Sequence, residues 1–229
     1  MLTTTFFALA SLAAANPITP RAYPPRQTSS GFTLIANLTD PTKSTLFNDP
    51  INHWSFGSVH VGAGLNTAIL TPPTHGHILF VNGTGRDVSA EATSVSLPPL
   101  ETTNGLIPWG VQFSQYPSST TPESVYIGVN FGYGSIGAGI RGGLRSPWPV
   151  AFAPLQGKWM VCNESAPTYG RPQYPVRIAQ EVPENCAEMT LLAQCATLPV
   201  PLLGVEEFGY QVMEVDCYED VKGIEWGRY

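Results

Sequence analysis

Short runs of alternating apolar and polar residues, each stopped by Gly, Pro, Asn or Asp, fill the chain from residue 31 onward. In the run 54–61, Phe56, Ser58 and His60 fall on one face of an extended strand and Val59 on the other. No segment keeps an apolar period of about 3.6 residues, so long helices are not expected. Such runs predict strands at 32–38, 54–61, 65–71, 77–82, 109–113, 124–131, 158–162, 174–180, 187–194 and 208–218, with a shorter one near residue 95.

The number and spacing of these strands predict an all-β fold. About ten short antiparallel strands separated by turns are typical of a β-sandwich, with a closed β-barrel or a β-trefoil as alternatives. No repeat of fixed period is present, which disfavours the trefoil. The segment 187–194 is rich in helix-forming residues, so a helix is the competing assignment there.

The first 30 residues differ in composition from the rest. Residues 1–15 contain an apolar run followed by three alanines, the pattern of an export signal peptide and its cleavage site. Neither this run nor any later one reaches the about 20 apolar residues that span a bilayer. Residues 16–30 are rich in Pro, Ser and Thr and are expected to form a disordered leader. We expect residues 31–229 to form a single secreted β-rich domain, located outside the cell or in the cell wall.

Four cysteines in a chain with an export signal predict two disulfides. Of the three possible pairings, Cys162–Cys186 with Cys195–Cys217 is preferred because it links strands adjacent in sequence, and the other two stay open. A zinc site is disfavoured, since the 23, 8 and 21 intervening residues contain no close pair of cysteines.

The charge balance restricts the class of partner. Charged residues make up 12% of the chain and the net charge is −6. The 11 basic residues are scattered, so they form no patch for nucleic acid or for an anionic membrane. The polar surface must come from uncharged side chains, as in many exported proteins.

Three Asn-X-Ser/Thr sequons occur, at Asn37, Asn82 and Asn163. In a secreted protein such sites accept N-linked glycans when the asparagine is exposed. Each lies at or just after the end of a predicted strand, and we expect two of them to be used.

His60, His75 and His77 are the candidates for a metal site. On an extended chain residues i and i+2 point to one face, so His75 and His77 can approach the same ion. No acidic residue follows in 78–82, and the surrounding Pro and Gly residues favour exposed turn histidines instead. No cofactor is therefore expected.

Two glycine motifs resemble catalytic or cofactor-binding signatures. Residues 132–137 match G-x-G-x-x-G, but Gly139 and Pro147 oppose the helix that a dinucleotide site requires. Ser135 lies near a G-x-S-x-G pattern whose first glycine is replaced by Tyr133. A glycine-rich loop is the simpler interpretation of both.

Clustered acids and aromatic residues suggest two ways of handling carbohydrate. A carboxylate pair can hydrolyse a glycosidic bond, although acid clusters are usually only solvated; the acids concerned are Glu206, Glu207, Glu214, Asp216, Glu219 and Asp220. Aromatic side chains can stack on sugar rings, although they more often lie in the core; the residues concerned are Trp54, Trp109, Trp148, Tyr169 and Tyr174.

The segments 32–36 (FTLIA), 59–64 (VHVGAG), 159–163 (WMVCN), 169–176 (YGRPQYPV) and 191–195 (LLAQC) resemble a family of small secreted fungal proteins of unknown function. More distantly, the chain is similar to fungal cell-wall proteins of the phialide-associated type. The resemblance covers most of 31–218. It implies secretion, wall association and an all-β domain, and it brings no catalytic residues.

The leading hypothesis is a non-catalytic, secreted, N-glycosylated protein of the fungal surface or cell wall, or an effector-like protein. Its partner would be a cell-wall polysaccharide or a host or surface protein. The first alternative is a carbohydrate-binding module that uses exposed aromatic residues. The second is a metal-dependent enzyme that uses His60, His75 and His77.

Overall fold

The computed structural model describes residues 24–102, 105–115, 124–141, 150–153, 157–165, 172–199 and 208–226. The strands are β1 (Gln27–Ser29), β2 (Gly31–Leu38), β3 (Ser55–Gly62), β4 (Leu65–Thr71), β5 (Phe80–Asn82), β6 (Ser94–Thr102), β7 (Gly105–Gln115), β8 (Val125–Phe131), β9 (Gly139–Arg141), β10 (Ala151–Ala153), β11 (Lys158–Cys162), β12 (Glu164–Ser165), β13 (Pro172–Gln173), β14 (Val176–Ala179), β15 (Cys186–Ala196), β16 (Val212–Met213) and β17 (Val215–Cys217). The helical segments are η1 (Pro41–Leu46), η2 (Pro73–His75) and α1 (Gly85–Ser89).

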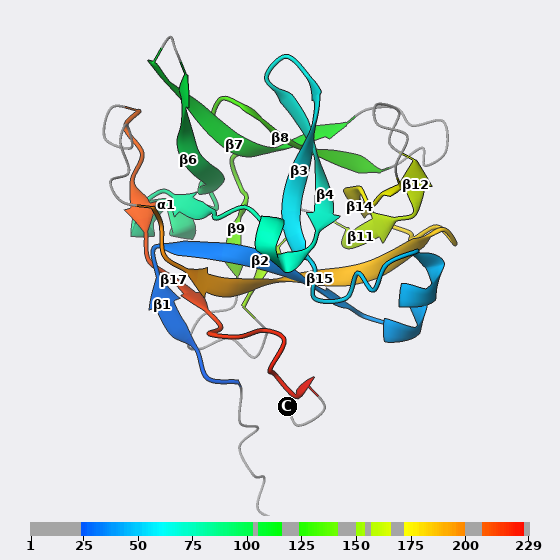
Figure 1. The fold of residues 1–229 in the computed structure, drawn as a ribbon. Coiled ribbons are helices and arrows are strands. Elements are labelled where there is room, and N and C mark those ends of the chain that lie inside the picture. The colour runs from blue at the N-terminus through cyan, green and yellow to red at the C-terminus, as the bar shows by residue number, and fades with distance from the viewer. Residues whose placement is uncertain are drawn as a thin grey trace, which may run out of the picture.

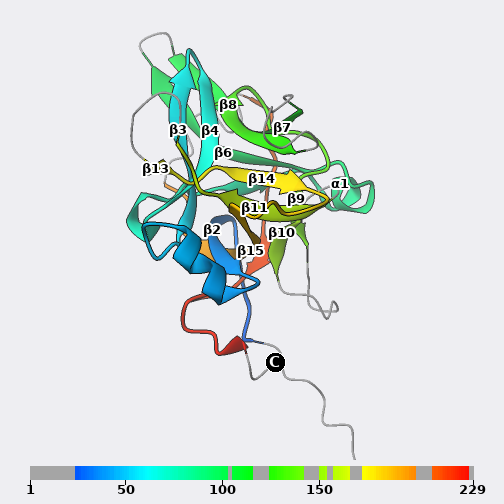
Figure 2. The ribbon, with the colours of Figure 1, turned by 90° about the vertical axis from the view of Figure 1, so that its right-hand side faces the viewer.

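An antiparallel sheet of 13 strands forms the body of the molecule, in the order β14-β11-β15-β2-β3-β4-β8-β7-β6-β5-β16 with β9 and β10 attached through β15. β14 also pairs with β8, so seven of these strands form a closed ring. In Figure 1, β2 and β15 lie below a layer that holds β3, β4, β6, β7 and β8. Figure 2 shows β11 and β14 on the side where the ring closes. The all-β antiparallel prediction is confirmed. The fold has two layers, as in a sandwich, and a closed ring of strands, as in a barrel.

The core includes side chains from both faces of the long central strands. β2 and β15 pair over eight residues, from Gly31↔Ala196 to Leu38↔Met189. Phe32, Leu34 and Ala36 are completely buried on one face of β2. Each large apolar side chain removed from water contributes about 1.5–3 kcal/mol, so this face is a main source of stability.

Both predicted disulfides are present with the preferred pairing, Cys162–Cys186 and Cys195–Cys217. Cys162 and Cys186 are direct partners in the β11–β15 register. Cys195 in β15 is linked to Cys217 in β17, which attaches the C-terminal segment to the main sheet. The stretch 187–194 is strand, as predicted, because it lies between β11 and β2 and its backbone groups are used on both sides.

Three boundaries differ from the sequence predictions. Residues 27–29 were expected in a disordered leader, but they form β1, which pairs with β17. The expected strand 208–218 is divided into β16 and β17, because these pair with β5 and β1 respectively. The expected strand 77–82 is ordered as β5 only over its last three residues. Residues 1–23, which hold the expected signal peptide and most of the leader, lie outside the described residues.

A small separate core lies next to β5. It is formed by Phe80, Leu198 and Tyr210, the last of which comes just before β16. The Phe80 and Tyr210 rings lie 5.3 Å apart, edge to face. Among the described residues, no helix is long and apolar enough to cross a membrane.

Candidate binding surface

The three candidate metal ligands are not brought together. Nδ1 of the exposed His60 lies 3.2 Å from Oδ1 of Asn66, and Nδ1 of His75 lies 3.3 Å from the Thr74 hydroxyl. Within the described ranges no three His, Cys, Asp or Glu side chains form a group that can hold a metal ion. Because all three histidines are in those ranges, the alternative of a metal centre built from them is not supported.

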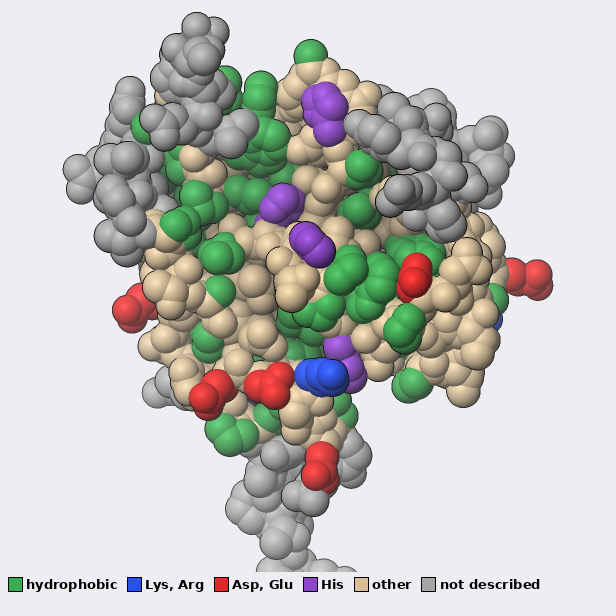
Figure 3. Space-filling model, viewed as in Figure 1, with side chains coloured by type: hydrophobic (Ala, Val, Ile, Leu, Met, Phe, Trp, Pro, Cys, Tyr) green, Lys and Arg blue, Asp and Glu red, His purple; other side chains and the backbone are tan. Residues whose placement is uncertain are grey.

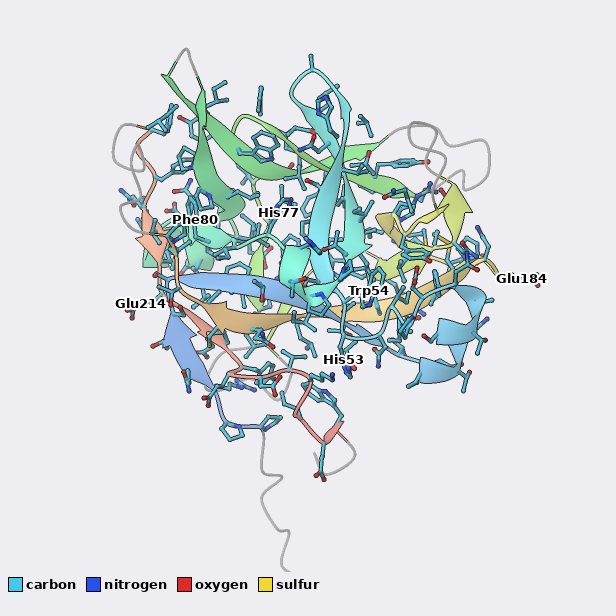
Figure 4. The ribbon with its side chains drawn as sticks, viewed as in Figure 1. His53, Trp54, His77, Phe80, Glu184 and Glu214 are labelled. Carbon is cyan, nitrogen blue, oxygen red and sulfur yellow. A yellow bond between two sulfur atoms is a disulfide. The ribbon has the colours of Figure 1, made fainter. Side chains whose placement is uncertain are left out.

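His77 has a different environment from the exposed turn that the sequence predicts. It is half-buried, and its Nε2 lies 2.8 Å from Oγ of Ser58 in β3. Burial lowers the pKa of its imidazole, so the ring is held neutral. Figure 4 shows His77 above the level of β2 and His53 below it.

The Ser58–His77 contact pairs a hydroxyl nucleophile with a neutral base. Serine hydrolysis also needs a group that orients the imidazole through its second nitrogen and donors for an oxyanion. In the described part of the chain, Nδ1 of His77 has no protein partner. We therefore interpret the contact as a hydrogen bond that pairs the half-buried Ser58 hydroxyl with the half-buried His77 imidazole.

The aromatic residues suggested by the sequence do not form an exposed strip. Tyr174 is buried, and its ring packs edge to face against Phe47 and Trp54 at 5.4 Å and 5.7 Å. Trp109 is half-buried against Phe131. Trp148 and Tyr169 lie outside the described residues. Tyr174 also donates a 2.7 Å hydrogen bond to Oδ2 of Asp49, and burial followed by this bond raises its pKa to about 12.

Two of the candidate acids form hydrogen bonds near the C-terminal turn. Glu219 accepts a hydrogen bond from the Gln27 amide at 3.2 Å, and Asp220 accepts one from the Lys222 backbone at 3.1 Å. Glu214 is exposed between β16 and β17. An open pocket of ≈ 410 Å³ lies beside Glu219 and Asp220. Asp216 is half-buried in β17, opposite Thr28 of β1. Glu206 and Glu207 lie outside the described residues.

The sequons differ in how their side chains are held. Asn163 is exposed just after β11, and its Nδ2 donates to the carbonyl of Leu46 at 2.6 Å. Asn82 is the last residue of β5, and its Oδ1 accepts from the Gln211 backbone at 2.8 Å. Asn37 is half-buried inside β2 and faces its register partner Thr190 on β15.

Exposed apolar side chains occur in the β3–β4 hairpin and at the end of β8, and the sequence analysis did not predict them. Tyr133, just after β8, packs its ring on Tyr210 at 5.4 Å. We name Val61, Leu65, Phe131 and Tyr133 the aromatic platform; their exposed fractions are 41%, 48%, 40% and 51%. Gly64 in the hairpin turn has a φ of +70°, and a Cβ there would lie 2.5 Å from the Phe131 ring. The Phe131 N–H donates to the Gly64 carbonyl at 3.0 Å. The hairpin and the end of β8 are thus in direct contact.

A connected set of polar side chains holds this region. We name His60, Asn66, Asn130 and Gln112 the polar row. Oδ1 of Asn130 accepts from the Asn66 backbone at 2.9 Å, and its Nδ2 donates to Oε1 of Gln112 at 3.2 Å. Nε2 of Gln112 donates to the carbonyls of Phe131 and Tyr133 at 3.4 Å and 3.2 Å. One amide therefore fixes the backbone on both sides of Gly132.

A sequence signal for this site did exist. Phe131 and Tyr133 flank Gly132 at the end of an apolar strand, where fewer neighbours cover a large side chain. The contribution of Gly64, Asn66 and Gln112 could not be found in the same way. These residues lie outside β8 and meet Phe131 or Asn130 only in the folded protein.

Comparison with known proteins assigns the family. Residues 29–195 match the profile of a family described as a domain of unknown function, DUF7907. The chain is also similar to an antigenic protein, SchS34, of the fungus Stachybotrys chartarum, with 30% identity over 94% of this chain and 99% of that protein. No solved structure matches the chain. The expected likeness to an uncharacterised fungal family is confirmed, and the phialide-type likeness stays a prediction. The chain belongs to the DUF7907 family.

Proposed function

We propose that this protein is a secreted, N-glycosylated, non-catalytic protein of the fungal surface or cell wall, or an effector-like protein. The observation that carries the proposal is the pair of disulfides. Disulfides persist in oxidising compartments and are rare in the cytosol. Cys162, Cys186 and Cys217 are at most 1% exposed, so the links belong to the folded core and not to its surface.

The family relationship supports the same proposal. The relative that covers nearly all of this chain is named an antigenic protein, and an antigen is encountered outside the cell that makes it. We infer an extracellular location for this chain too, consistent with the apolar segment and alanines in residues 1–15.

We propose Asn82 and Asn163 as the two glycosylated asparagines. Asn163 is exposed, and its Nδ2 uses one hydrogen on the Leu46 carbonyl and keeps the second for replacement by a sugar. At Asn82 the hydrogen bond to the Gln211 backbone uses Oδ1, which leaves Nδ2 for a sugar. Asn37 is half-buried next to Thr190 within the sheet, where a glycan has little room.

The test is secretion of the full chain from a filamentous fungal host, followed by intact-mass measurement before and after enzymatic removal of N-glycans. We expect two glycans, no free thiols, and the loss of one glycan each in Asn82→Gln and Asn163→Gln. Asn37→Gln is the matched control and should leave the mass of the glycans unchanged. Retention inside the cell or free thiols in the secreted protein would overturn the proposal.

The non-catalytic part of the proposal has its own test. The secreted protein is incubated with ester, peptide and glycoside substrates. Ser58→Ala is assayed in parallel, because Oγ of Ser58 lies 2.8 Å from Nε2 of His77, closer than the Thr74 hydroxyl lies to His75 in the described part of the chain. We expect no turnover by either protein. Turnover that Ser58→Ala abolishes would show an active site and contradict the proposal.

Carbohydrate binding is the second candidate function, favoured by the aromatic platform.

A further inference from the structure

We propose that the Cys195–Cys217 disulfide is a redox-sensitive switch, which an external thiol reductant opens in the folded protein while Cys162–Cys186 stays closed. Its opening loosens β1 and β17, which we name the terminal sheet, from the main sheet. This inference rests on the extracellular, disulfide-linked state proposed above and adds a means of regulating it.

The two disulfides differ in how far solvent reaches them. Thiol–disulfide exchange begins when a thiolate reaches one sulfur of the bond, so a disulfide buried among apolar side chains is protected. Cys162 and Cys186 are 0% and 1% exposed and pack with Met160 in a small apolar cluster. Cys217 is also buried, but Cys195, in the second-last position of β15, is partly exposed. Cys195 is therefore the point of attack.

The backbone around the two bonds also differs. Cys162 and Cys186 are direct register partners, and β11 is paired on both sides, with β14 and with β15. Cys217 is the last residue of β17, which pairs with β1 over three residues. A sheet this small opens locally at a lower free-energy cost than a strand inside a large sheet. The Cys195–Cys217 bond can therefore open without disturbing the closed ring of strands.

The reaction transfers two electrons and two protons from a dithiol, either a small molecule or a protein with two neighbouring cysteines. Its first thiolate attacks Sγ of Cys195, the bond to Cys217 breaks, and Cys217 leaves with the electron pair and takes up a proton. The second thiol then attacks the mixed disulfide, which returns Cys195 to a thiol and leaves the reductant as a disulfide. Sγ of Cys217 lies 3.7 Å from the Gln27 carbonyl, which can accept a hydrogen bond from the new thiol.

Reduction loosens the terminal sheet and not the whole molecule, because a second attachment remains. Tyr218 follows Cys217, is 1% exposed, and donates its N–H to the Ala193 carbonyl at 2.9 Å. Its carbonyl accepts from the Cys195 N–H at 2.8 Å, and its hydroxyl accepts from the Val150 N–H at 3.1 Å. These bonds keep residue 218 on the main sheet, so the segments that reduction loosens are 27–29 and 215–217.

The charge around the terminal sheet favours neutral or cationic reductants. Glu214 and Glu219 are exposed before and after β17, and Asp216 lies within it. In Figure 3 acidic side chains lie along the lower left, around the place of β1 and β17 in Figure 1. A thiol that carries an extra carboxylate is repelled by such a surface, and the repulsion weakens as salt is added.

The experiment is graded reduction of the secreted protein with dithiothreitol under native conditions, followed by alkylation, digestion and mass spectrometry of each cysteine. We expect Cys195 and Cys217 to be alkylated together, at least about tenfold faster than Cys162 and Cys186. The control is the same reduction in denaturant. There the two pairs should react at rates within about twofold of each other, because their sequence separations of 22 and 24 residues are similar.

Hydrogen exchange tests the switch itself. In the selectively reduced protein, amide exchange should become at least about tenfold faster in 27–29 and 215–217, stay unchanged in 186–189, and return to its original rate after reoxidation.

Three thiols of different charge test the selectivity. At equal thiolate concentration, cysteamine should open the Cys195–Cys217 bond faster than 2-mercaptoethanol, and 3-mercaptopropionate more slowly, with ratios that narrow at high salt. Rates that do not depend on the charge of the thiol would refute this selectivity.

One variant tests whether the terminal sheet limits the rate of reduction. Oγ of Ser29 in β1 donates to the Ala196 carbonyl at the end of β15 at 2.9 Å. Ser29→Ala removes this hydrogen bond and should speed reduction of Cys195–Cys217 about two- to fivefold, while the other disulfide is unaffected. Ser89→Ala is the matched control, because Oγ of Ser89 makes a similar hydrogen bond to the Gly85 carbonyl, at 3.1 Å, within α1.

Three outcomes would overturn the inference: equal reduction of both pairs in the folded protein, earlier reduction of Cys162–Cys186, or selective reduction with unchanged exchange in 27–29 and 215–217. Each of them leaves the secreted, disulfide-linked protein of the proposed function standing. Free thiols in the protein as secreted, before any reductant is added, would refute the proposed function instead.

Discussion

His77 and Ser58 show how a half-buried polar pair fits into this protein. The imidazole is close to the apolar interior, and Ser58 supplies a 2.8 Å partner for Nε2. Burial lowers the pKa of the imidazole, so protonation of the folded state is resisted while protonation of the unfolded chain is not. This difference makes the free energy of unfolding depend on pH.

For the parent protein we expect the free energy of unfolding to be highest above pH about 6.5, the ordinary imidazole pKa, and to fall as the pH drops toward the lowered pKa of the folded state. His77→Gln keeps a partner for Ser58 and should show a weaker fall in urea unfolding at pH 5 to 8. Some dependence remains, because burial, and then Lys222, also lower the pKa of His53. Identical pH profiles of parent and variant would contradict the explanation.

The pKa of Tyr174 is shifted upward, so this residue makes the free energy of unfolding depend on pH in the opposite direction. Its pKa is raised to about 12 by burial and by the hydrogen bond to Asp49. The stabilisation is complete below pH about 10 and is lost as the pH rises through the folded-state value. Tyr174→Phe should cost about 1–2 kcal/mol at pH 7 and should lose stability less steeply between pH 9 and 11. Tyr133→Phe, at an exposed position, is the control, and a steeper alkaline loss in Tyr174→Phe would refute this reading.

Close contact between elements is most severe where the loop after β8 crosses β7. A Cβ at Gly110 would lie 2.1 Å from the backbone nitrogen of Gly134, and one at Gly134 would lie 2.3 Å from the Val95 carbonyl. Such backbone contacts cannot be relieved by rotating a side chain. The two glycines therefore serve packing between elements, and the G-x-G-x-x-G pattern around Gly134 needs no cofactor to explain it.

Gly110→Ala should lower the free energy of unfolding by about 3 kcal/mol or prevent folding, because overpacking of this kind typically costs about 1–3 kcal/mol and here the contact is with backbone. The matched control is Gly85→Ala in the first turn of α1, where a Cβ meets nothing within 4 Å. It should be neutral or stabilising by up to about 1 kcal/mol. Equal effects in thermal and urea unfolding would show that the crossing is loose.

At the scale of the whole molecule, the two disulfides link different kinds of elements. Cys162–Cys186 joins strands that already pair in register, whereas Cys195–Cys217 attaches β17, and through it β1, to the main sheet. The sequence separations of 24 and 22 residues are similar, so the two links restrict the unfolded chain to a similar extent.

Replacing either cysteine pair by serine should therefore cost about 3 kcal/mol. Only Cys195→Ser/Cys217→Ser should also speed amide hydrogen exchange in 27–29 and 215–217, because it frees the small sheet of β1 and β17. Cys162→Ser/Cys186→Ser is the comparison. Exchange in these segments that is equal in both double variants would show that β1 and β17 are held by other contacts.

Most of the strands could be predicted because they are local patterns. The runs 32–38 and 65–71 are short, rich in strand-forming residues and bounded by turn residues, and the structure places strands there. The leader prediction was wrong at 27–29, where a polar stretch pairs with a segment almost 190 residues later. The alternative of an exposed aromatic strip is contradicted at Trp54 and Tyr174, which pack against the core. Apolarity alone does not distinguish a core ring from a surface ring.

The sequence by itself determined the all-β class and the presence of two disulfides, and it favoured the observed pairing over the other two. Residue period and cysteine spacing are properties of short stretches of chain. Only the tertiary structure decided that β14 pairs with β8 to close the ring, that the three histidines lie apart, and that Phe131 meets Gly64 beside Gln112. The physical reason is that these contacts depend on the registers and crossings of distant strands, which the whole set of paired and packed residues determines together.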